Sequence, residues 1–180
     1  MLRGGRDRRI SRIVPIVLLL ATACTGGVDA IALDGTPRHA DAQGVVTAVS
    51  NDRLTLDGTK TYDIDPKIQC FSASTQSAIP LAGRKGTFVQ LGLDGKTVKW
   101  LAGYSAVIEF PGRPSVAYHN GVLEEASGRD AIFEDGSVLP VGAGVDAPPP
   151  GSRVTAEIDV KKKAITRFTP AAAVARPAAP

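Results

Sequence analysis

Short runs of alternating apolar and polar residues, separated by turn-forming pairs, limit most strongly what this chain can fold into. The runs are rich in β-branched and aromatic residues, and they occupy residues 44–49, 54–56, 62–64, 88–93 and 98–100. Asp57-Gly58 and Asp94-Gly95 lie between such runs, and Asp-Gly favours a tight hairpin because the turn needs positive φ. After residue 23, no segment carries a helical apolar stripe of ten or more residues. The sequence therefore predicts an all-β protein.

The strand pattern occurs twice along the chain. Residues 44–46 (Gly-Val-Val) return as 121–123 (Gly-Val-Leu), 54–58 return as 132–136, and 86–94 return as 151–159. Each copy holds four to five short strands, which predicts two related small antiparallel β-barrels or sandwiches of the OB or SH3-like kind. We expect one β-domain over 44–110, a linker over 111–115 and a second β-domain over 116–169. The linker segment has two prolines and is short and stiff, so the repeats are expected to pack together as one cooperative unit.

This arrangement of turns and strands, over roughly residues 44–169, resembles uncharacterised extracytoplasmic β-domains of bacteria. The resemblance rests on turns and strands alone, and it supplies no catalytic residue.

The N-terminal residues are typical of a secretory signal. Five arginines face one acid over residues 3–12, and the run Ile13–Ala23 carries no charge and ends in small residues. Its 11 residues are too few to span a bilayer, which takes about 20. Residues 1–23 are therefore expected to be a signal peptide.

The junction Leu20-Ala21-Thr22-Ala23-Cys24 resembles the lipobox of bacterial lipoproteins. The resemblance implies that the Cys24 thiol is acylated, that residues 24–43 form a tether, and that the protein is held at the outer face of the cell membrane or in the periplasm. Ala21 stands where leucine is commoner in that family, so cleavage after Ala23 by ordinary signal peptidase, giving a freely secreted protein, stays open.

The excess of basic over acidic residues in this chain lies in residues 1–23. Residues 1–23 hold five of the 21 basic and one of the 18 acidic residues, so the remainder has 16 basic and 17 acidic residues. A mature chain with this balance has no basic excess for nucleic acid, and no nucleic-acid partner is expected. The Ala- and Pro-rich residues 170–180 are expected to be a disordered tail.

Candidate catalytic and metal-binding residues are few. Cys70 lies between apolar residues and is expected to be a buried thiol, the alternative being a disulfide with Cys24 that would exclude the lipid. His119 precedes Asn120-Gly121 and is expected in a surface turn. His39 and His119 are too far apart in sequence to predict a metal site, and no cofactor or metal is expected.

The remaining polar and aromatic candidates have ordinary structural interpretations. Asp63 and Asp65 are expected on the exposed face of a strand, and the lysines of 161–163 in a solvated hairpin turn. Trp100 and Phe88 are expected in the core. Tyr62 and Tyr104 remain candidates for ligand contact, since aromatic side chains on an OB-type sheet can stack on sugars or bases.

These observations predict a non-catalytic binding or structural module of the cell envelope, with the membrane, and an envelope protein or a glycan, as partners. The alternative is a secreted or envelope enzyme whose site would use Cys70, His119 or the carboxylates, although no catalytic motif occurs in the sequence.

Overall fold

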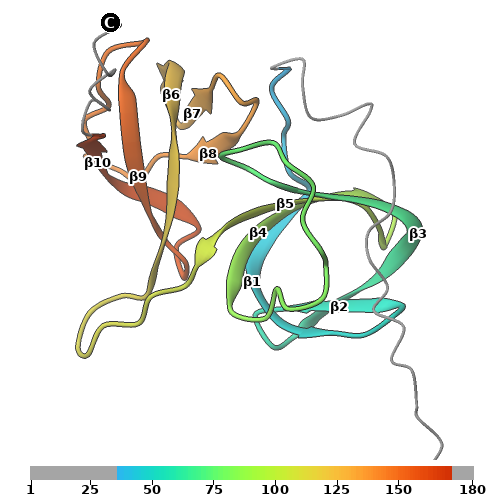
Figure 1. The fold of residues 1–180 in the computed structure, drawn as a ribbon. Coiled ribbons are helices and arrows are strands. Elements are labelled where there is room, and N and C mark those ends of the chain that lie inside the picture. The colour runs from blue at the N-terminus through green and yellow to red at the C-terminus, as the bar shows by residue number, and fades with distance from the viewer. Residues whose placement is uncertain (1–35, 172–180) are drawn as a thin grey trace, which may run out of the picture.

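The computed structural model describes residues 36–171, and these residues form ten β-strands and no helix (Figure 1). The all-β prediction is confirmed. The strands are β1 (Ala42–Val49), β2 (Arg53–Leu56), β3 (Lys60–Ser72), β4 (Thr87–Asp94), β5 (Thr97–Ala106), β6 (Val116–Ser127), β7 (Asp130–Phe133), β8 (Val138–Pro140), β9 (Arg153–Asp159) and β10 (Ala164–Pro170). No helix in this part of the chain is long and apolar enough to cross a membrane.

The first five strands close into a barrel in the order β1-β2-β3-β5-β4. Antiparallel pairing of β1 with β4 completes the ring. The prediction of a purely antiparallel barrel is wrong at one pair, because β3 and β5 run parallel. The long connection over residues 73–86 carries the chain across to β1, where β4 pairs, and β5 then returns beside β3. Parallel neighbours need a long connection of this kind.

The predicted hairpin between β2 and β3 is confirmed. The turn has three residues, 57–59, between the paired Leu56 and Lys60, and Asp57 and Gly58 have positive φ values of 51° and 72°. Gly95 (φ 62°) likewise turns β4 into β5.

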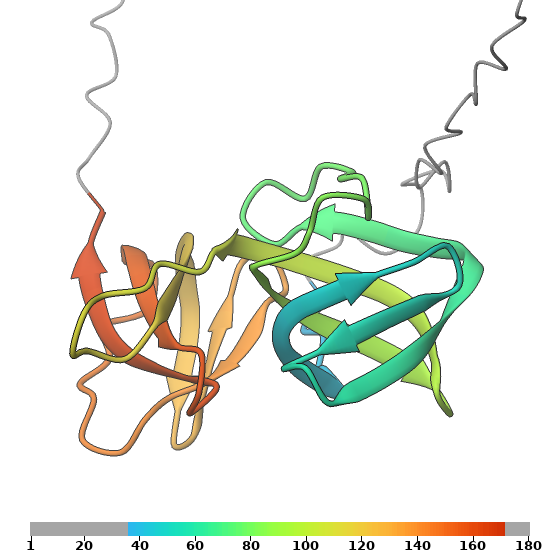
Figure 2. The ribbon, with the colours of Figure 1, turned by 90° about the horizontal axis from the view of Figure 1, so that it is seen from below.

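The last five strands form a sheet in the order β10-β9-β6-β7-β8. Its two edges approach each other at a single parallel bridge between Val141, just after β8, and Ile165 on β10. We refer to β1–β5 as the barrel and to β6–β10 as the second unit. Figure 2 shows the two units side by side, joined by the loop between β5 and β6.

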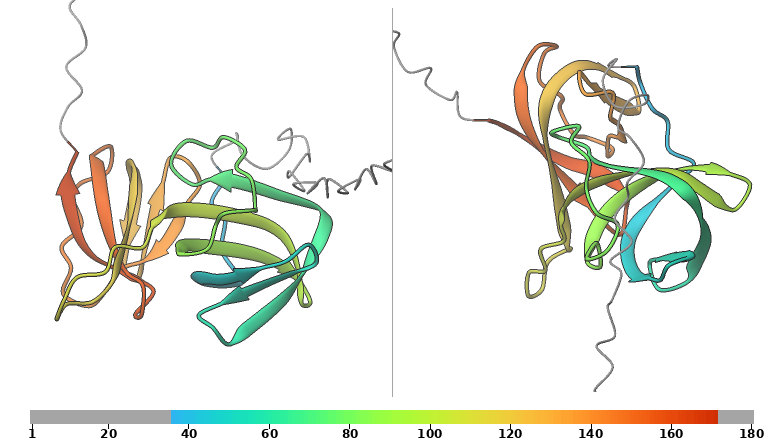
Figure 3. Two further views of the ribbon diagram at one scale, coloured as in Figure 1. Left: turned by 60° about the horizontal axis from the view of Figure 1, so that its bottom comes forward. Right: turned by 45° about the vertical axis from the view of Figure 1, so that its right-hand side comes forward.

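Two apolar clusters hold the molecule together. One fills the barrel interior, with Leu54, Leu56, Leu91 and Leu101 fully buried. The other spans both units: Phe71, Phe88 and Tyr104, on the outer face of the barrel, pack with the buried side chains of the second unit. Removing apolar surface from water is the main stabilising term here, at roughly 25 cal/mol per Å². The two units therefore share one core across their junction. Figure 3 shows from two further sides how the units lie beside each other.

The segment before β1 belongs to the fold over part of the expected tether. Arg38 bridges to Ser137 of the second unit, and β1 begins at Ala42. At the other end β10 includes Pro170, the first residue of the expected tail. The expected signal peptide 1–23, Cys24 and residues 172–180 lie outside the described residues.

Candidate functional site

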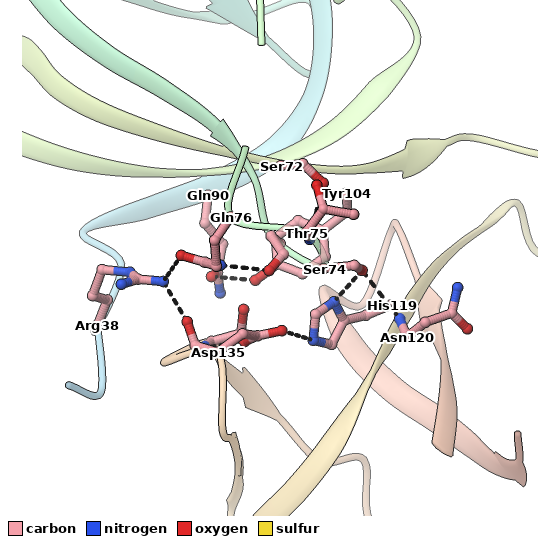
Figure 4. Close-up of polar contacts among 12 residues, drawn as sticks. Arg38, Ser72, Ser74, Thr75, Gln76, Gln90, Tyr104, His119, Asn120 and Asp135 are labelled. Atoms are coloured by element: carbon pink, nitrogen blue, oxygen red, sulfur yellow. Dashed lines mark hydrogen bonds and ion pairs between the residues drawn. The ribbon is translucent and has the colours of Figure 1, made fainter. Parts of the chain in front are cut away.

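A chain of three polar side chains crosses the junction between the two units (Figure 4). Ser74 lies in the β3–β4 connection, His119 on β6, and Asp135 in the turn between β7 and β8. The Ser74 hydroxyl is 3.1 Å from His119 Nδ1, and His119 Nε2 is 3.1 Å from Asp135 Oδ2. The second contact has the distance of an ion pair, and neither of its two atoms makes a hydrogen bond among the described residues.

His119 is fully buried, so the prediction that it lies in a surface turn is wrong. It pairs with Ala156 in the middle of the β6–β9 ladder, and its ring points into the junction. Phe133 and Tyr104 pack edge-on against it, with ring centroids 4.5 and 5.3 Å away. The following Asn120-Gly121 suggested a turn, but β6 continues through both residues to Ser127.

The Asp135 carboxylate is held in its charged form. Burial favours the neutral acid and would raise its pKa, but the contact with His119 and the hydrogen bond from the Ser137 backbone outweigh it. The net effect is a pKa below the usual value. Hydrogen bonds to a carboxylate favour its ionised form in this way.

Arg38 ties the N-terminal segment to both units. Its guanidinium donates to the Gln76 side chain at 3.0 Å and to the Asp135 carbonyl at 2.6 Å, and it lies over the Phe71 ring. The Arg38 backbone N–H also donates to the Gly136 carbonyl. The Asp135 turn is thus fixed from two sides, by Arg38 and by His119.

Tyr104 and Gln90 form a second, fully buried connection. The Tyr104 hydroxyl donates to Gln90 Oε1 at 2.6 Å, and Gln90 Nε2 donates to the Val138 carbonyl of β8 at 2.8 Å. Burial raises the pKa of Tyr104 well above its usual value, so the phenol stays neutral. Tyr104 is therefore a core residue at the junction, and it does not face solvent where a ligand could approach.

Ser74, His119 and Asp135 are the residue types of a hydrolytic triad, in the order in which a triad uses them. Two features differ from that arrangement. The serine contacts Nδ1 and the aspartate Nε2, the reverse of the usual assignment, and the Asn120 N–H donates to the Ser74 hydroxyl at 3.3 Å. The contacts among these three side chains join three segments from the two units. They are therefore suited to holding the junction together.

Cys70 lies inside the barrel with 4% of its surface exposed, as predicted. His119 lies at the junction among aromatic rings. The structure thus does not bring Cys70 and His119 together into the catalytic pair of the enzyme alternative. The alternative pairing of Cys70 with Cys24 falls outside the described residues.

A cavity of about 380 Å³ lies beside this network, between the barrel and the second unit. Its wall includes the start of β1, Lys60 and Tyr62 from β3, and Asp130 and Pro140 from the second unit, with Gln90 and Val138 shared with the buried network. Tyr62, a sequence candidate for ligand contact, therefore lines a cavity, whereas Tyr104 does not. Volumes of this size are usual for small-molecule sites.

The other sequence candidates occupy structural positions. Asp65 pairs with Lys99 at 2.6 Å, and this hydrogen bond is the main reason that the pKa of Asp65 is lowered. Asp63 lies 3.8 Å from Arg53 on the neighbouring strand. Among residues 36–171 no three His, Cys, Asp or Glu side chains are grouped so that they could hold a metal ion.

Lys163 differs from the two lysines before it. All three lie in the β9–β10 turn, as predicted, but the Lys163 ammonium reaches the barrel. It donates to Asp57 Oδ2 at 2.6 Å and to the Gln43 carbonyl at 2.5 Å, while Gln43 Nε2 donates back to the Lys163 carbonyl. The interpretation of this turn as wholly solvated is wrong for that residue.

Sequence reasoning missed Ser74, Gln90 and Asp135. The only signal for Asp135 was its place in the duplicated Asp-Gly turn, and nothing in the sequence relates Ser74 or Gln90 to the second unit. No protein-family model, curated protein or solved structure matches this chain.

Proposed function

We propose that this protein is an exported, lipid-anchored envelope protein that acts without catalysis as a binding module. The observation that carries the binding role is the cavity between the two units, because its wall includes polar side chains with no hydrogen bond or ion pair among the described residues. The export signal over 1–23 and the lipobox-like junction at Cys24 support the location. The all-β fold in two tightly joined units is consistent with a rigid extracytoplasmic module.

We also propose that the two units are repeats of one OB-like ancestor. The strand order β1-β2-β3-β5-β4, closed by β1, is that of an OB barrel. In the second unit β6 pairs with β7 and β9, β7 with β8, and β9 with β10, which are the equivalents of the barrel pairs. The parallel Val141–Ile165 bridge takes the place of the β3–β5 pair.

Backbone hydrogen bonds support the same correspondence residue by residue. Asp57 N donates to Val45 O in the barrel, and Glu134 N donates to Val122 O in the second unit. In the same way the N–H of Gly86 donates to Val46 and that of Gly151 to Leu123. The acceptors and the two glycines are residues that the sequence repeat aligns, whereas Glu134 lies one residue before Asp135, the residue aligned with Asp57. Two OB-like barrels of this size would each bury a small core, and sharing a core across the junction offsets that deficit.

The enzyme alternative now depends on Ser74, since Cys70 is inside the barrel. A working nucleophile needs a base and a cavity beside it for substrate. Ser74 lines neither of the two principal cavities of the described residues. We expect no covalent labelling by a fluorophosphonate probe, measured by intact-protein mass spectrometry. Stoichiometric labelling that Ser74→Ala abolishes would establish a serine hydrolase instead.

Export and anchoring are tested by fractionation of cells that express the full chain. We expect the protein in the membrane fraction, extractable by detergent, and Cys24→Ser to release it or block its processing. Cys70→Ser is the matched control and should leave the protein membrane-bound. An unmodified N-terminus after Ala23, found by mass spectrometry, would establish the freely secreted form.

A further inference from the structure

We propose that the cavity between the barrel and the second unit is a saccharide-binding site for an uncharged sugar chain, with Tyr62, Lys60 and Asp130 as its ligand-contacting residues. This inference deepens the binding role proposed above by naming its site and its ligand class. It does not depend on the lipid anchor.

Four side chains of the cavity wall are available to a ligand. His39, Lys60, Tyr62 and Asp130 line the cavity, and none of these side chains has a hydrogen bond or ion pair among the described residues. Together they offer donors from the ammonium, phenol and imidazole groups and acceptors from the carboxylate. Sugar hydroxyls both donate and accept, so a mixed set of this kind suits them.

The charge of the wall disfavours an anionic ligand. Two lysines and two aspartates line the cavity, Lys60, Lys163, Asp41 and Asp130. The Lys163 charge is already offset by Asp57 at 2.6 Å. The remaining charges of the wall are one lysine, Lys60, and two carboxylates. The wall therefore has no excess positive charge that would favour a phosphate, a sulfate or nucleic acid.

Tyr62 supplies the apolar contact that a sugar ring needs. Its side chain is half-buried and packs against the barrel core, and the residue forms part of the cavity wall. Aromatic rings combine a large apolar surface with a polar tip, so Tyr62 can lie against the C–H face of a sugar while its hydroxyl stays hydrated.

The cavity walls are held in place by residues that are not free to bind. Gln43 and Lys163 bond to each other across the junction, Gln90 bonds to Val138, and Asp41 accepts from the Leu93 N–H. A preformed wall of this kind lowers the ordering cost of binding. Because the wall comes from both units, the site exists only while they are joined.

The test is calorimetric titration of the full chain carrying Cys24→Ser, so that no lipid interferes. The neutral probes are chitotriose, cellotriose, maltotriose and mannotriose, and a heparin-derived tetrasaccharide is the anionic comparator. We expect at least one neutral probe to bind with Kd between about 1 μM and 1 mM. Asp130→Asn and Tyr62→Ala should each weaken that binding by about tenfold or more, which is about 1.4 kcal/mol.

Matched controls separate the site from general effects. Tyr118→Ala removes another half-buried tyrosine, and Asp146→Asn an exposed aspartate, and neither lines the cavity. Both should bind as the parent does. Asp130→Asn changes a side chain with no hydrogen bond or ion pair within residues 36–171, so its effect does not depend on an altered fold.

Three outcomes would overturn the proposal: no binding of any neutral probe, binding that Tyr62→Ala and Asp130→Asn leave unchanged, or binding confined to the heparin tetrasaccharide. None of them bears on membrane fractionation, which depends on Cys24. Failure of the saccharide site is thus distinguishable from failure of the envelope location.

Discussion

Individual residues at the junction combine burial with polarity in an unusual way. His119 is fully buried and Asp135 has a side chain only 12% exposed, yet His119 Nε2 and Asp135 Oδ2 make no hydrogen bond among the described residues and lie 3.1 Å from each other. Buried polar groups of this kind are costly once a partner is lost, because the remaining group cannot regain its water. The stability of the junction is therefore concentrated in a small number of side chains.

Asp135→Asn should lower the free energy of unfolding by about 1–3 kcal/mol near neutral pH, because it removes the charged partner of His119. The pKa of Asp135 is lowered in the folded state, so its contribution is present above its unfolded value of about 3.8 and is lost as pH falls through the lower folded value. Urea unfolding at pH 6 and near pH 3 measures this.

The difference between parent and variant should be large at pH 6 and shrink at the acidic pH. Asp146→Asn, in an exposed loop, is the control and should change stability at neither pH. An equal deficit for Asp135→Asn at both pH values would contradict the role of the ionised carboxylate.

Gly92 matters to the packing because it has no side chain. It pairs with Trp100 across β4 and β5, and a Cβ at this position would overlap the indole ring. Gly92→Ala should displace the ring, cost about 1–3 kcal/mol and shift the emission of the single tryptophan. Fluorescence spectra with urea unfolding measure both; an unchanged spectrum at unchanged stability would contradict this packing.

The strands show which parts of the structure a sequence can specify. Period-two runs and Asp-Gly pairs are local signals, and they placed β1, β2, β4 and β5 and the turns at Asp57 and Asp94. The parallel β3–β5 pair was missed because it depends on contacts between segments about 30 residues apart, for which no local signal exists.

His119 was misplaced for a related reason: Asn-Gly usually marks a turn, and only pairing with β9 keeps that stretch extended.

The candidate site was predictable in part. Tyr62 was a candidate before the structure and it lines the cavity, but Lys60 and Asp130 carry no sequence signature that separates them from ordinary exposed charges. Their significance arises because the packing of two units places them around one space. Gln90 was hidden within a strand as the one polar residue of an apolar stretch.

The β9–β10 turn provides a prediction at the scale of an element. Lys163→Ala should destabilise the protein by about 0.5–1.5 kcal/mol, because it removes the half-buried, hydrogen-bonded ion pair with Asp57 and the hydrogen bond to the Gln43 carbonyl. Lys161→Ala, two residues earlier and exposed, should have an effect near zero. Thermal unfolding of both variants tests this prediction. Equal losses of stability in the two variants would mean that the contact with Asp57 contributes nothing.

The whole molecule is asymmetric in how its two units depend on each other. The barrel has an interior cluster of its own, whereas the buried side chains of the second unit belong to the cluster that includes Phe71, Phe88 and Tyr104 of the barrel. The second unit also lacks a closed ring of strands. The barrel therefore supplies part of the core on which the second unit is built.

We expect the intact protein to unfold in a single transition, and the separated pieces to behave differently. Residues 36–115 alone should retain a folded barrel of reduced stability, while residues 116–171 alone should be unfolded. Circular dichroism and urea titration of the two pieces measure this. Independent folding of 116–171, with the midpoint of the intact chain, would contradict the shared core.

The route by which the chain enters the fold determines where a mechanical load would act. Arg38 leads directly into the barrel strand β1, and at the seam it is bonded to Asp135 and Gly136 of the second unit as well as to Gln76 of the barrel. Tension applied from the N-terminal side, as a membrane anchor at Cys24 would apply it, reaches these bonds before it reaches the β1–β4 pairs. The N-terminal segment would therefore detach from the seam before β1 is pulled from the barrel, while the shared core would still hold the two units together.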